Sequence, residues 1–171
     1  MIKMQHPEYE LFTADSTHYK AGVACADCHM PYQRDGAVKY SSHFVASPLK
    51  YAEQACGACH ADVTYVVERV AKIQKQVNDT MLRSEDALVA AIQAITDTAQ
   101  LPTFNAGVLD EARLLHRKAQ LRWDFIAAEN SMGFHNPEEA LRILADSIDY
   151  ARQAELKARL ASQANKAAAL K

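Results

Sequence analysis

Apolar side chains recur at helical spacing through most of the second half of the chain. Between residues 61 and 99 they return every three or four positions, which is the period of a helix with one buried face. The positions that carry this pattern are Val63, Val66, Val67, Val70, Ile73, Val77, Met81, Leu88, Ala91 and Ile95. Asp62 is a suitable N-cap and Pro102 a suitable stop, so the pattern predicts one long helix of about 61–99.

The same periodicity predicts two further helices, of about 106–130 and 137–168. The first has apolar positions at Leu109, Ala112, Leu115, Ala119, Trp123 and Ile126 and is expected to end near Gly133. The second begins with a capping arrangement, in which Asn136 is the N-cap, Pro137 is the first helical residue and Glu139 is the third. Its apolar positions are Leu141, Leu144, Ile148 and Ala151.

Residues 1–60 have a different character. They contain three of the five prolines, all four cysteines and five of the seven histidines. They show no alternating pattern long enough to predict a useful strand. We therefore expect a mainly α protein, with a loop-rich cofactor-binding part over 1–60 and a helical part over 61–171.

Charge and hydropathy exclude several classes of partner. The net charge is −2, and no basic run suggests nucleic acid or a membrane surface. No run of 18 apolar residues is present, and the chain begins with polar sequence rather than a signal peptide.

One signature occurs twice, as Cys25-Ala26-Asp27-Cys28-His29 and as Cys56-Gly57-Ala58-Cys59-His60. Cys-x-x-Cys-His lets two thiols form thioethers to the vinyl groups of a haem while the adjacent imidazole binds the iron. A zinc site built from the two cysteine pairs and a pair of disulfides are the alternatives. Neither alternative needs a histidine after each pair, so we interpret the signatures as two covalent haem c sites. Such haems are attached outside the cytoplasm, which predicts a periplasmic protein and an export signal upstream of this sequence.

The histidines divide according to what two haems require. His29 and His60 are the proximal ligands, and the sixth position of each iron is either open or filled by another His or a Met. His116 lies in a helical pattern and is interpreted as an ordinary helical residue. The remaining candidates outnumber the two irons, and they are His6, His18, His43 and His135, with Met4, Met81 and Met132 as weaker ones.

The arrangement of these residues resembles the C-terminal part of the pentahaem, ammonia-forming cytochrome c nitrite reductases. The resemblance is carried by Lys3-Met4-Gln5-His6-Pro7-Glu8, His18 seven residues before Cys25, His43 thirteen before Cys56, Arg122-Trp123-Asp124 and His135-Asn136-Pro137-Glu138-Glu139. It covers essentially the whole chain. Absent are the family's Cys-x-x-Cys-Lys motif of the catalytic haem, two further Cys-x-x-Cys-His motifs, and the arginine and tyrosine of the active site. The chain is therefore expected to be one fragment of a larger multihaem domain.

The resemblance assigns roles to the first residues of the chain. His6 is similar to the active-site histidine that binds nitrite and helps to deliver protons. We expect an extended backbone there, because the residue before a proline avoids helical conformations. Gln5 by its side chain and Lys3 by its carbonyl resemble ligands of the family's structural calcium.

The resemblance also implies how the irons are ligated. It pairs His29 with His135 at the first haem and His60 with His18 at the second. His43 resembles a residue that ligates a haem of the missing portion, which accounts for the surplus histidine.

Two functions follow from these expectations. The chain is either part of an enzyme for the six-electron reduction of nitrite to ammonium, or a stand-alone dihaem electron carrier without catalytic activity. The first function implies as partners nitrite, the missing N-terminal haem-bearing part, an electron-donating quinol-linked cytochrome or membrane protein, and a second copy in a homodimer. The isolated chain lacks the lysine-ligated haem and is expected to be inactive alone.

Overall fold

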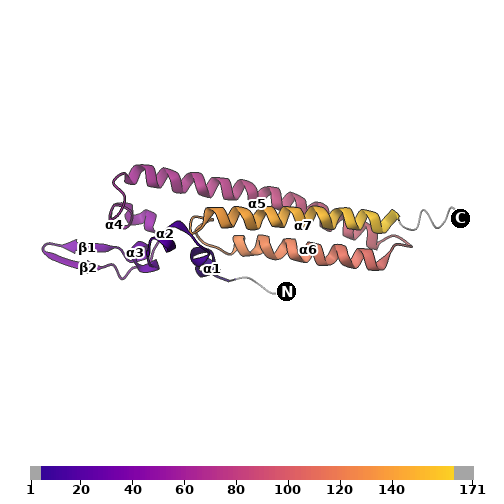
Figure 1. The fold of residues 1–171 in the computed structure, drawn as a ribbon, viewed down its shortest axis with the longest axis horizontal. Helices are drawn as coiled ribbons and strands as arrows, with labels where there is room; N and C mark the ends of the chain where they lie inside the picture. Colours follow the sequence, from indigo (N-terminus) through magenta and orange to yellow (C-terminus); the bar gives the residue numbers. More distant parts are fainter. Residues whose placement is uncertain (1–4, 164–171) are drawn as a thin grey trace.

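Three long helices form an elongated bundle, and a group of short elements lies at one end of it (Figure 1). The computed structural model of the chain describes residues 5–163, so Lys3 and the predicted end of the last helix near residue 168 lie outside the described part. The mainly α fold predicted from the sequence is confirmed. Within the described residues, no helix is long and apolar enough to cross a membrane.

The bundle consists of α5 (Val63–Ala99), α6 (Ala106–Ala127) and α7 (Pro137–Gln163). Successive helices run in opposite directions, so α5 and α7 both lead away from the short elements (Figure 1). The predicted bounds of α5 are correct to within two residues at its start. The second helix ends at Ala127, three residues before its predicted end, because the chain turns after Ala128.

Side-chain caps define where the three helices begin. Asp62 accepts a hydrogen bond from the third residue of α5 at 2.9 Å, as predicted. Asn105 caps α6 in the same way at 3.2 Å. The predicted cap Asn136 accepts from the amide of Glu139 at 3.2 Å. The Glu139 side chain instead binds Arg142, so the capping box expected from the sequence is only half formed.

Small side chains let the helices approach closely along most of the bundle. The fully buried alanines are Ala87, Ala91, Ala112, Ala119, Ala140, Ala151, Ala154, Ala158 and Ala161. A buried polar link joins the three helices at mid-length, where Ser84 and Ser147 are 2.8 Å apart and Ser147 donates to the Ala119 carbonyl at 2.8 Å. Because these hydroxyls hydrogen-bond to each other, their burial costs little free energy, and the link fixes the register of the helices.

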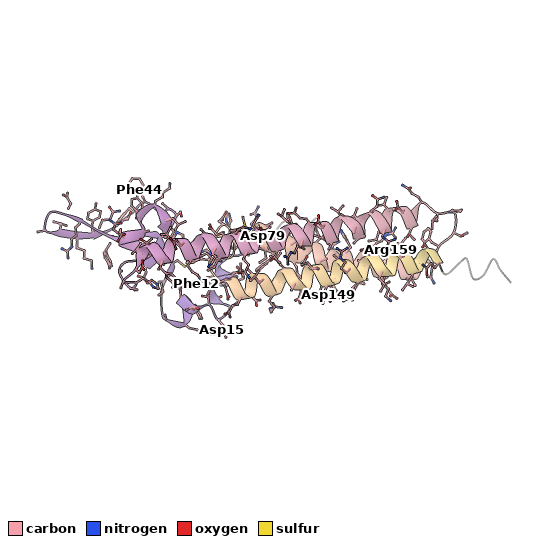
Figure 2. All side chains as sticks on the ribbon, turned by 90° about the horizontal axis from the view of Figure 1, so that it is seen from above. Phe12, Asp15, Phe44, Asp79, Asp149 and Arg159 are labelled. Atoms are coloured by element: carbon pink, nitrogen blue, oxygen red, sulfur yellow. The ribbon has the colours of Figure 1, made fainter. Side chains whose placement is uncertain are left out.

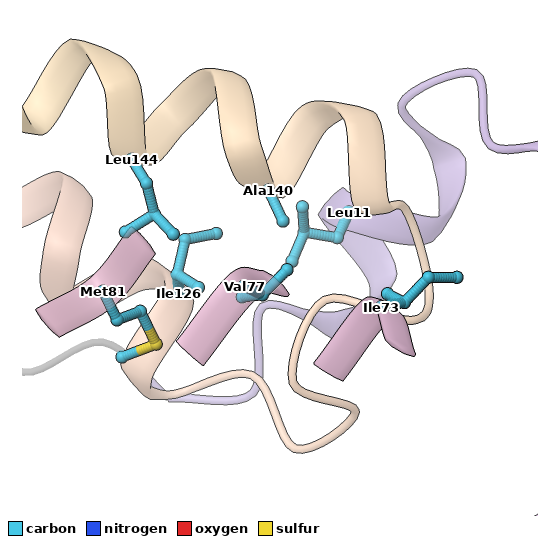
Figure 3. Close-up of a cluster of buried hydrophobic side chains, with 7 residues drawn as sticks. All are labelled: Leu11, Ile73, Val77, Met81, Ile126, Ala140 and Leu144. Atoms are coloured by element: carbon cyan, nitrogen blue, oxygen red, sulfur yellow. The ribbon is translucent and has the colours of Figure 1, made fainter. Parts of the chain in front are cut away.

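Larger side chains gather where the bundle meets the short elements. The cluster in Figure 3 comprises Leu11, Ile73, Val77, Met81, Ile126, Ala140 and Leu144. Leu11 is 1% exposed and is contributed by the first short helix. This helix is further tied to the start of α7, because the Asn136 amide donates to the carbonyls of Leu11 and Ala14 at 3.2 and 2.6 Å. The short elements before α5 are thus fixed to the bundle by both apolar and polar contacts.

The part of the chain before residue 62 contains short helices rather than loops alone. They are α1 (Glu8–Thr13), α2 (Thr17–Lys20), α3 (Cys25–His29), the 3-10 helix η1 (Pro48–Tyr51) and α4 (Ala52–Ala55). His18 belongs to the part expected to be loop-rich but lies in α2, whose Ser16 N-cap accepts a hydrogen bond from the Tyr19 amide at 3.2 Å.

A β-hairpin was not predicted. It pairs β1 (Tyr32–Asp35) with β2 (Val38–Ser41), in the antiparallel register Asp35↔Val38 to Tyr32↔Ser41. Its two-residue loop begins with Gly36 at φ +57°, the position that type II′ turns reserve for glycine. Six of its eight strand residues are exposed and the other two are half-buried, so the strands show no alternation of buried and exposed positions. The Asp35-Gly36 dipeptide is the signal that would have revealed it.

Gly133 allows the turn between α6 and α7 to pack directly on α5. Its φ is +82°, and a Cβ there would lie 2.6 Å from Val77 Cγ2 and 3.3 Å from the Ala140 Cβ. We expect Gly133→Ala to lower the free energy of unfolding by about 2–4 kcal/mol, because it adds a clash with a buried side chain to a strained backbone. The measurement is denaturant unfolding of the variant and of the unaltered protein.

Gly22→Ala is the matched control for this prediction. Gly22 also has a positive φ, of +75°, but nothing lies within 4 Å of its added Cβ. It should therefore cost only the backbone strain, about 1 kcal/mol. Equal losses in the two variants would show that packing against Val77 does not matter.

Candidate functional site

Local hydrogen bonds shape both cysteine signatures into a helical turn. In the first, the Asp27 carboxylate accepts from the Ala24 amide at 2.7 Å, which caps the turn that carries Cys25, Cys28 and His29. In the second, the amide of His60 donates to the carbonyl of Cys56 at 2.9 Å. The second cysteine and the histidine of a signature follow its first cysteine by three and four positions, so one helical turn places their side chains on the same face.

His29 lies opposite His135, although the two residues come from opposite ends of the sequence. Their ring centroids are 6.2 Å apart with an interplanar angle of 49°. His29 Nδ1 lies 2.9 Å from the carbonyl of Ala46, which can only accept a hydrogen bond. Nδ1 therefore carries the proton and Nε2 is left with a free lone pair for a metal.

His18 lies opposite His60 in the same manner. The ring centroids are 6.3 Å apart with an interplanar angle of 76°. Within residues 5–163, neither of these rings makes a hydrogen bond to another side chain or to the backbone. The second pair therefore lacks the anchoring that the first pair has.

Both separations fit an iron held between two imidazoles. A metal bound from opposite sides holds each ring nitrogen at about 2 Å, and a ring centroid lies about 1.1 Å further out, so the centroids stand about 6.2 Å apart. The two thiols of each signature lie on the same turn as its histidine. The thiols and imidazoles at each position would therefore fit a covalently attached haem with two histidine ligands.

The two histidine pairs are close neighbours. Burial lowers the pKa of His18, and the nearby charges of His60 and His135 lower it further. The Phe134 ring lies 6.0 Å from that of His18, and Phe12 lies 6.3 Å from His135. Two haems in these positions would lie side by side with aromatic rings around them.

A buried carboxylate supports His135. Glu129 is 3% exposed, and its Oε1 lies 2.6 Å from Nδ1 of His135. The same carboxylate accepts from the amides of Ser131 at 2.9 Å and Gly133 at 2.8 Å. Burial opposes its ionisation, but the hydrogen bonds from His135, Ser131 and Gly133 outweigh it and hold the pKa of Glu129 below its ordinary value.

The four cysteines are not paired with one another in the described part of the chain. All four are free thiols, and within the described part of the chain no group of three or more His, Cys, Asp or Glu is arranged to hold a metal ion. Burial raises the pKa of Cys28 and Cys56, and at Cys28 the nearby Cys56 adds to the effect. The two signatures therefore lie close together without forming a four-sulfur site.

His6 lies on an exposed segment beside the turn that follows α6. Its φ is +52°, so the extended backbone predicted before Pro7 is wrong. The reason is a tertiary contact, because Glu8 accepts hydrogen bonds from the amide and the side chain of Asn130, and the His6 ring lies 3.5 Å from that side chain. Histidine tolerates the left-handed region better than most residues.

Gln5 and His43, which the sequence assigns to a calcium site and to a haem of the missing portion, lie at the surface. Gln5 is exposed, and its proposed companion Lys3 is outside the described residues. His43 is exposed and precedes Phe44, which is 80% exposed at the end of the molecule that carries the hairpin (Figure 2). Neither His6 nor His43 belongs to a histidine pair. His116 is half-buried in α6, where burial lowers its pKa.

Three contributors to the site were not found by sequence reasoning. They are Glu129, Asn130 and the carbonyl of Ala46. A backbone carbonyl leaves no mark in a sequence. The only signal for Glu129 was a carboxylate in the non-periodic segment just before His135.

The chain matches the cytochrome c552 family over residues 1–170 and belongs to that family. Among its relatives, it is 44% identical over 162 residues to "Cytochrome c nitrite reductase subunit NrfA" of Nitratidesulfovibrio vulgaris, covering 90% of this chain and 31% of that protein. It is 38% identical over 162 residues to "Cytochrome c-552" of Bacteroides fragilis, with 91% and 31% covered. The chain thus spans about a third of the length of these relatives.

Comparison with solved structures supports the same family. The chain superposes on cytochrome c nitrite reductase from Desulfovibrio desulfuricans with a TM-score of 0.89 and 43% identity, covering 99% of this chain and 36% of the other. That catalytic subunit is described as having two calcium sites. The outer cell wall cytochrome OcwA gives a TM-score of 0.64 at 22% identity over 87% of this chain and 30% of the other, a likeness of fold alone.

Proposed function

We propose that the chain is the C-terminal part of an ammonia-forming cytochrome c nitrite reductase and supplies two electron-relay haems and one active-site histidine. The observation that carries the proposal is the pair of histidine juxtapositions, at 6.2 and 6.3 Å, each beside a Cys-x-x-Cys-His turn. The 44% identity to a nitrite reductase subunit supports the reaction class.

In this proposal the two haems carry electrons and do no chemistry on nitrite. Cys25 and Cys28 hold one haem and Cys56 and Cys59 the other. Conversion of nitrite to ammonium takes nitrogen from +3 to −3, so six electrons must reach one catalytic centre. Haem c supplies one-electron storage and transfer. An iron held by two histidines has no open position for substrate, which suits it to relay.

His6 and the adjacent residues would serve the catalytic centre on another part of the protein. An exposed imidazole held beside Glu8 and Asn130 can donate a hydrogen bond to an anionic substrate and transfer a proton. Gln5 and Lys3 would supply oxygen ligands to a calcium ion, whose preference is for such hard donors. His43 would ligate a haem of the missing N-terminal part.

The remaining partners follow from the same proposal. An electron-donating quinol-linked cytochrome or membrane protein would reduce the haems in the periplasm. A second copy would pack along the helices, where Leu82, Val89 and Ile92 of α5 are 51%, 64% and 46% exposed. Exposed apolar residues on one helix are typical of such a contact.

A stand-alone dihaem electron carrier remains the second candidate. The observation that favours it is that both histidine pairs are complete within this chain. It differs from the first candidate because it assigns no role to His6, to the calcium ligands Gln5 and Lys3, or to His43.

Reductant-driven ammonium production separates these candidates. We expect the 171-residue chain to accept electrons but to produce negligible ammonium from nitrite. In the complete protein, His6→Gln should lower turnover by about 10²-fold or more, because the substituted amide cannot transfer a proton. His116→Gln, which removes a histidine remote from the proposed sites, is the control. Vigorous turnover by the isolated chain, or an unaffected His6 variant, would contradict the proposal.

A further inference from the structure

The carboxylate beside His135 is the most conspicuous asymmetry between the two histidine pairs. His135 Nδ1 meets a charged, buried partner in Glu129, whereas no side chain within residues 5–163 hydrogen-bonds to the rings of His18 or His60. The roles assigned to this chain so far do not use Glu129.

We infer that Glu129 is a positioning residue that fixes the His135 imidazole as an iron ligand and lowers the reduction potential of the haem attached at Cys25 and Cys28. The inference rests on the proposed ligation of that haem by His135. It adds a residue that sets how readily this relay haem accepts an electron.

The geometry defines how Glu129 would hold the ring. A carboxylate can only accept, so Nδ1 of His135 carries the proton and Nε2 is free to bind a metal. The carboxylate is itself held by the amides of Ser131 and Gly133, and the Ser131 hydroxyl accepts from the His135 amide at 2.9 Å. The His135 ring and the Glu129 carboxylate therefore lie in one short turn, and these hydrogen bonds restrict rotation of the ring.

The charge defines the direction of the effect on the potential. A hydrogen bond from Nδ1 to a carboxylate makes the imidazole a stronger electron donor to iron. A negative charge buried near the haem also stabilises the ferric over the ferrous state, because the ferric haem carries one more positive charge. Both effects make reduction of this haem harder.

Glu129→Gln is the decisive variant, because its amide oxygen still accepts from His135 and Ser131 while the charge is lost. Only the bond from the Gly133 amide lacks a partner. In a spectroelectrochemical titration of the two-haem protein, we expect one component to move to higher potential and the other to stay. Both haems should remain low-spin.

Glu129→Ala and Glu139→Gln complete the experiment. The alanine removes both charge and acceptor, so it should raise the same potential and also produce a high-spin fraction in the electron paramagnetic resonance spectrum. Glu139→Gln removes one negative charge from the first turn of α7 without touching His135, and should leave both components in place. If the alanine variant fails to fold, the glutamine variant alone tests the inference.

A potential in Glu129→Gln that matches Glu139→Gln would overturn the inference. That failure differs from a failure of the proposed function. If His135→Ala leaves both haems low-spin, the proposed ligand pair is wrong. If His135 is a ligand and Glu129→Gln changes nothing, only the role of Glu129 is wrong.

Discussion

Replacing His135 by Ala is expected to convert one of two haems from low spin to high spin. The imidazole lies 6.2 Å from that of His29, and its loss leaves the first iron with an open or water-filled position. The other haem, between His18 and His60, should keep both ligands. Absorption spectra and electron paramagnetic resonance of the oxidised protein would show one high-spin and one low-spin centre.

Two comparisons make this result specific. His18→Ala should convert the second haem and leave the first unchanged. His43→Ala should leave both haems of this chain low-spin, because His43 is exposed and belongs to neither pair. Spectra of His135→Ala identical to those of the unaltered protein would make His43 or a methionine the candidate ligand instead.

Covalent attachment of two haems is the second large effect expected. Intact-protein mass spectrometry of denatured material should give the mass of the chain plus two haems, because thioethers survive denaturation while iron coordination does not. Replacing Cys25 and Cys28 together by Ser should remove one haem mass completely. Replacing Cys56 and Cys59 should remove the other.

Expression in two kinds of host cell provides the control for this measurement. The protein must be exported in cells that possess the haem-attachment machinery, and parallel expression without that machinery should give the bare mass. A bare mass from the competent host would rule out covalent haem. Retention of two haem masses in either double variant would show that the signatures are not the attachment points.

The helices were predictable because their signals are local and repeated. The apolar period of α5 extends over many turns, and Asp62 and Asn136 mark helix starts through a side chain that the sequence displays. The β-hairpin was missed because its residues are largely exposed, which leaves no alternation of buried and exposed positions. The helix that carries His18 has only four residues, which is too short to show a helical period in the sequence.

In the candidate site, too, local features were predictable from the sequence and tertiary contacts were not. Cys25, Cys28 and His29 are adjacent in the sequence, so their spacing alone indicated the chemistry. The partners of each histidine came from resemblance, since no local rule brings residue 135 to residue 29. Glu129 could not be predicted from the sequence because its role depends on a tertiary contact with His135. The backbone of His6 was mispredicted for the same reason, as the contact between Glu8 and Asn130 overrides the local preference before proline.

The juxtaposition of His29 and His135 also has a consequence for how the chain reaches its native state. These residues are 106 positions apart, whereas His43 is only 14 positions from His29. In an unfolded chain that already carries haem at Cys25 and Cys28, loop closure favours His43 over His135 by about 1.8 kcal/mol. The iron is therefore expected to capture a wrong histidine first and to hold it as a kinetic trap. If His135 is the ligand, as proposed, docking of α7 on α5 and α6 would offset this entropic handicap by bringing His135 to the iron, and bundle assembly would be the step at which the iron exchanges His43 for His135.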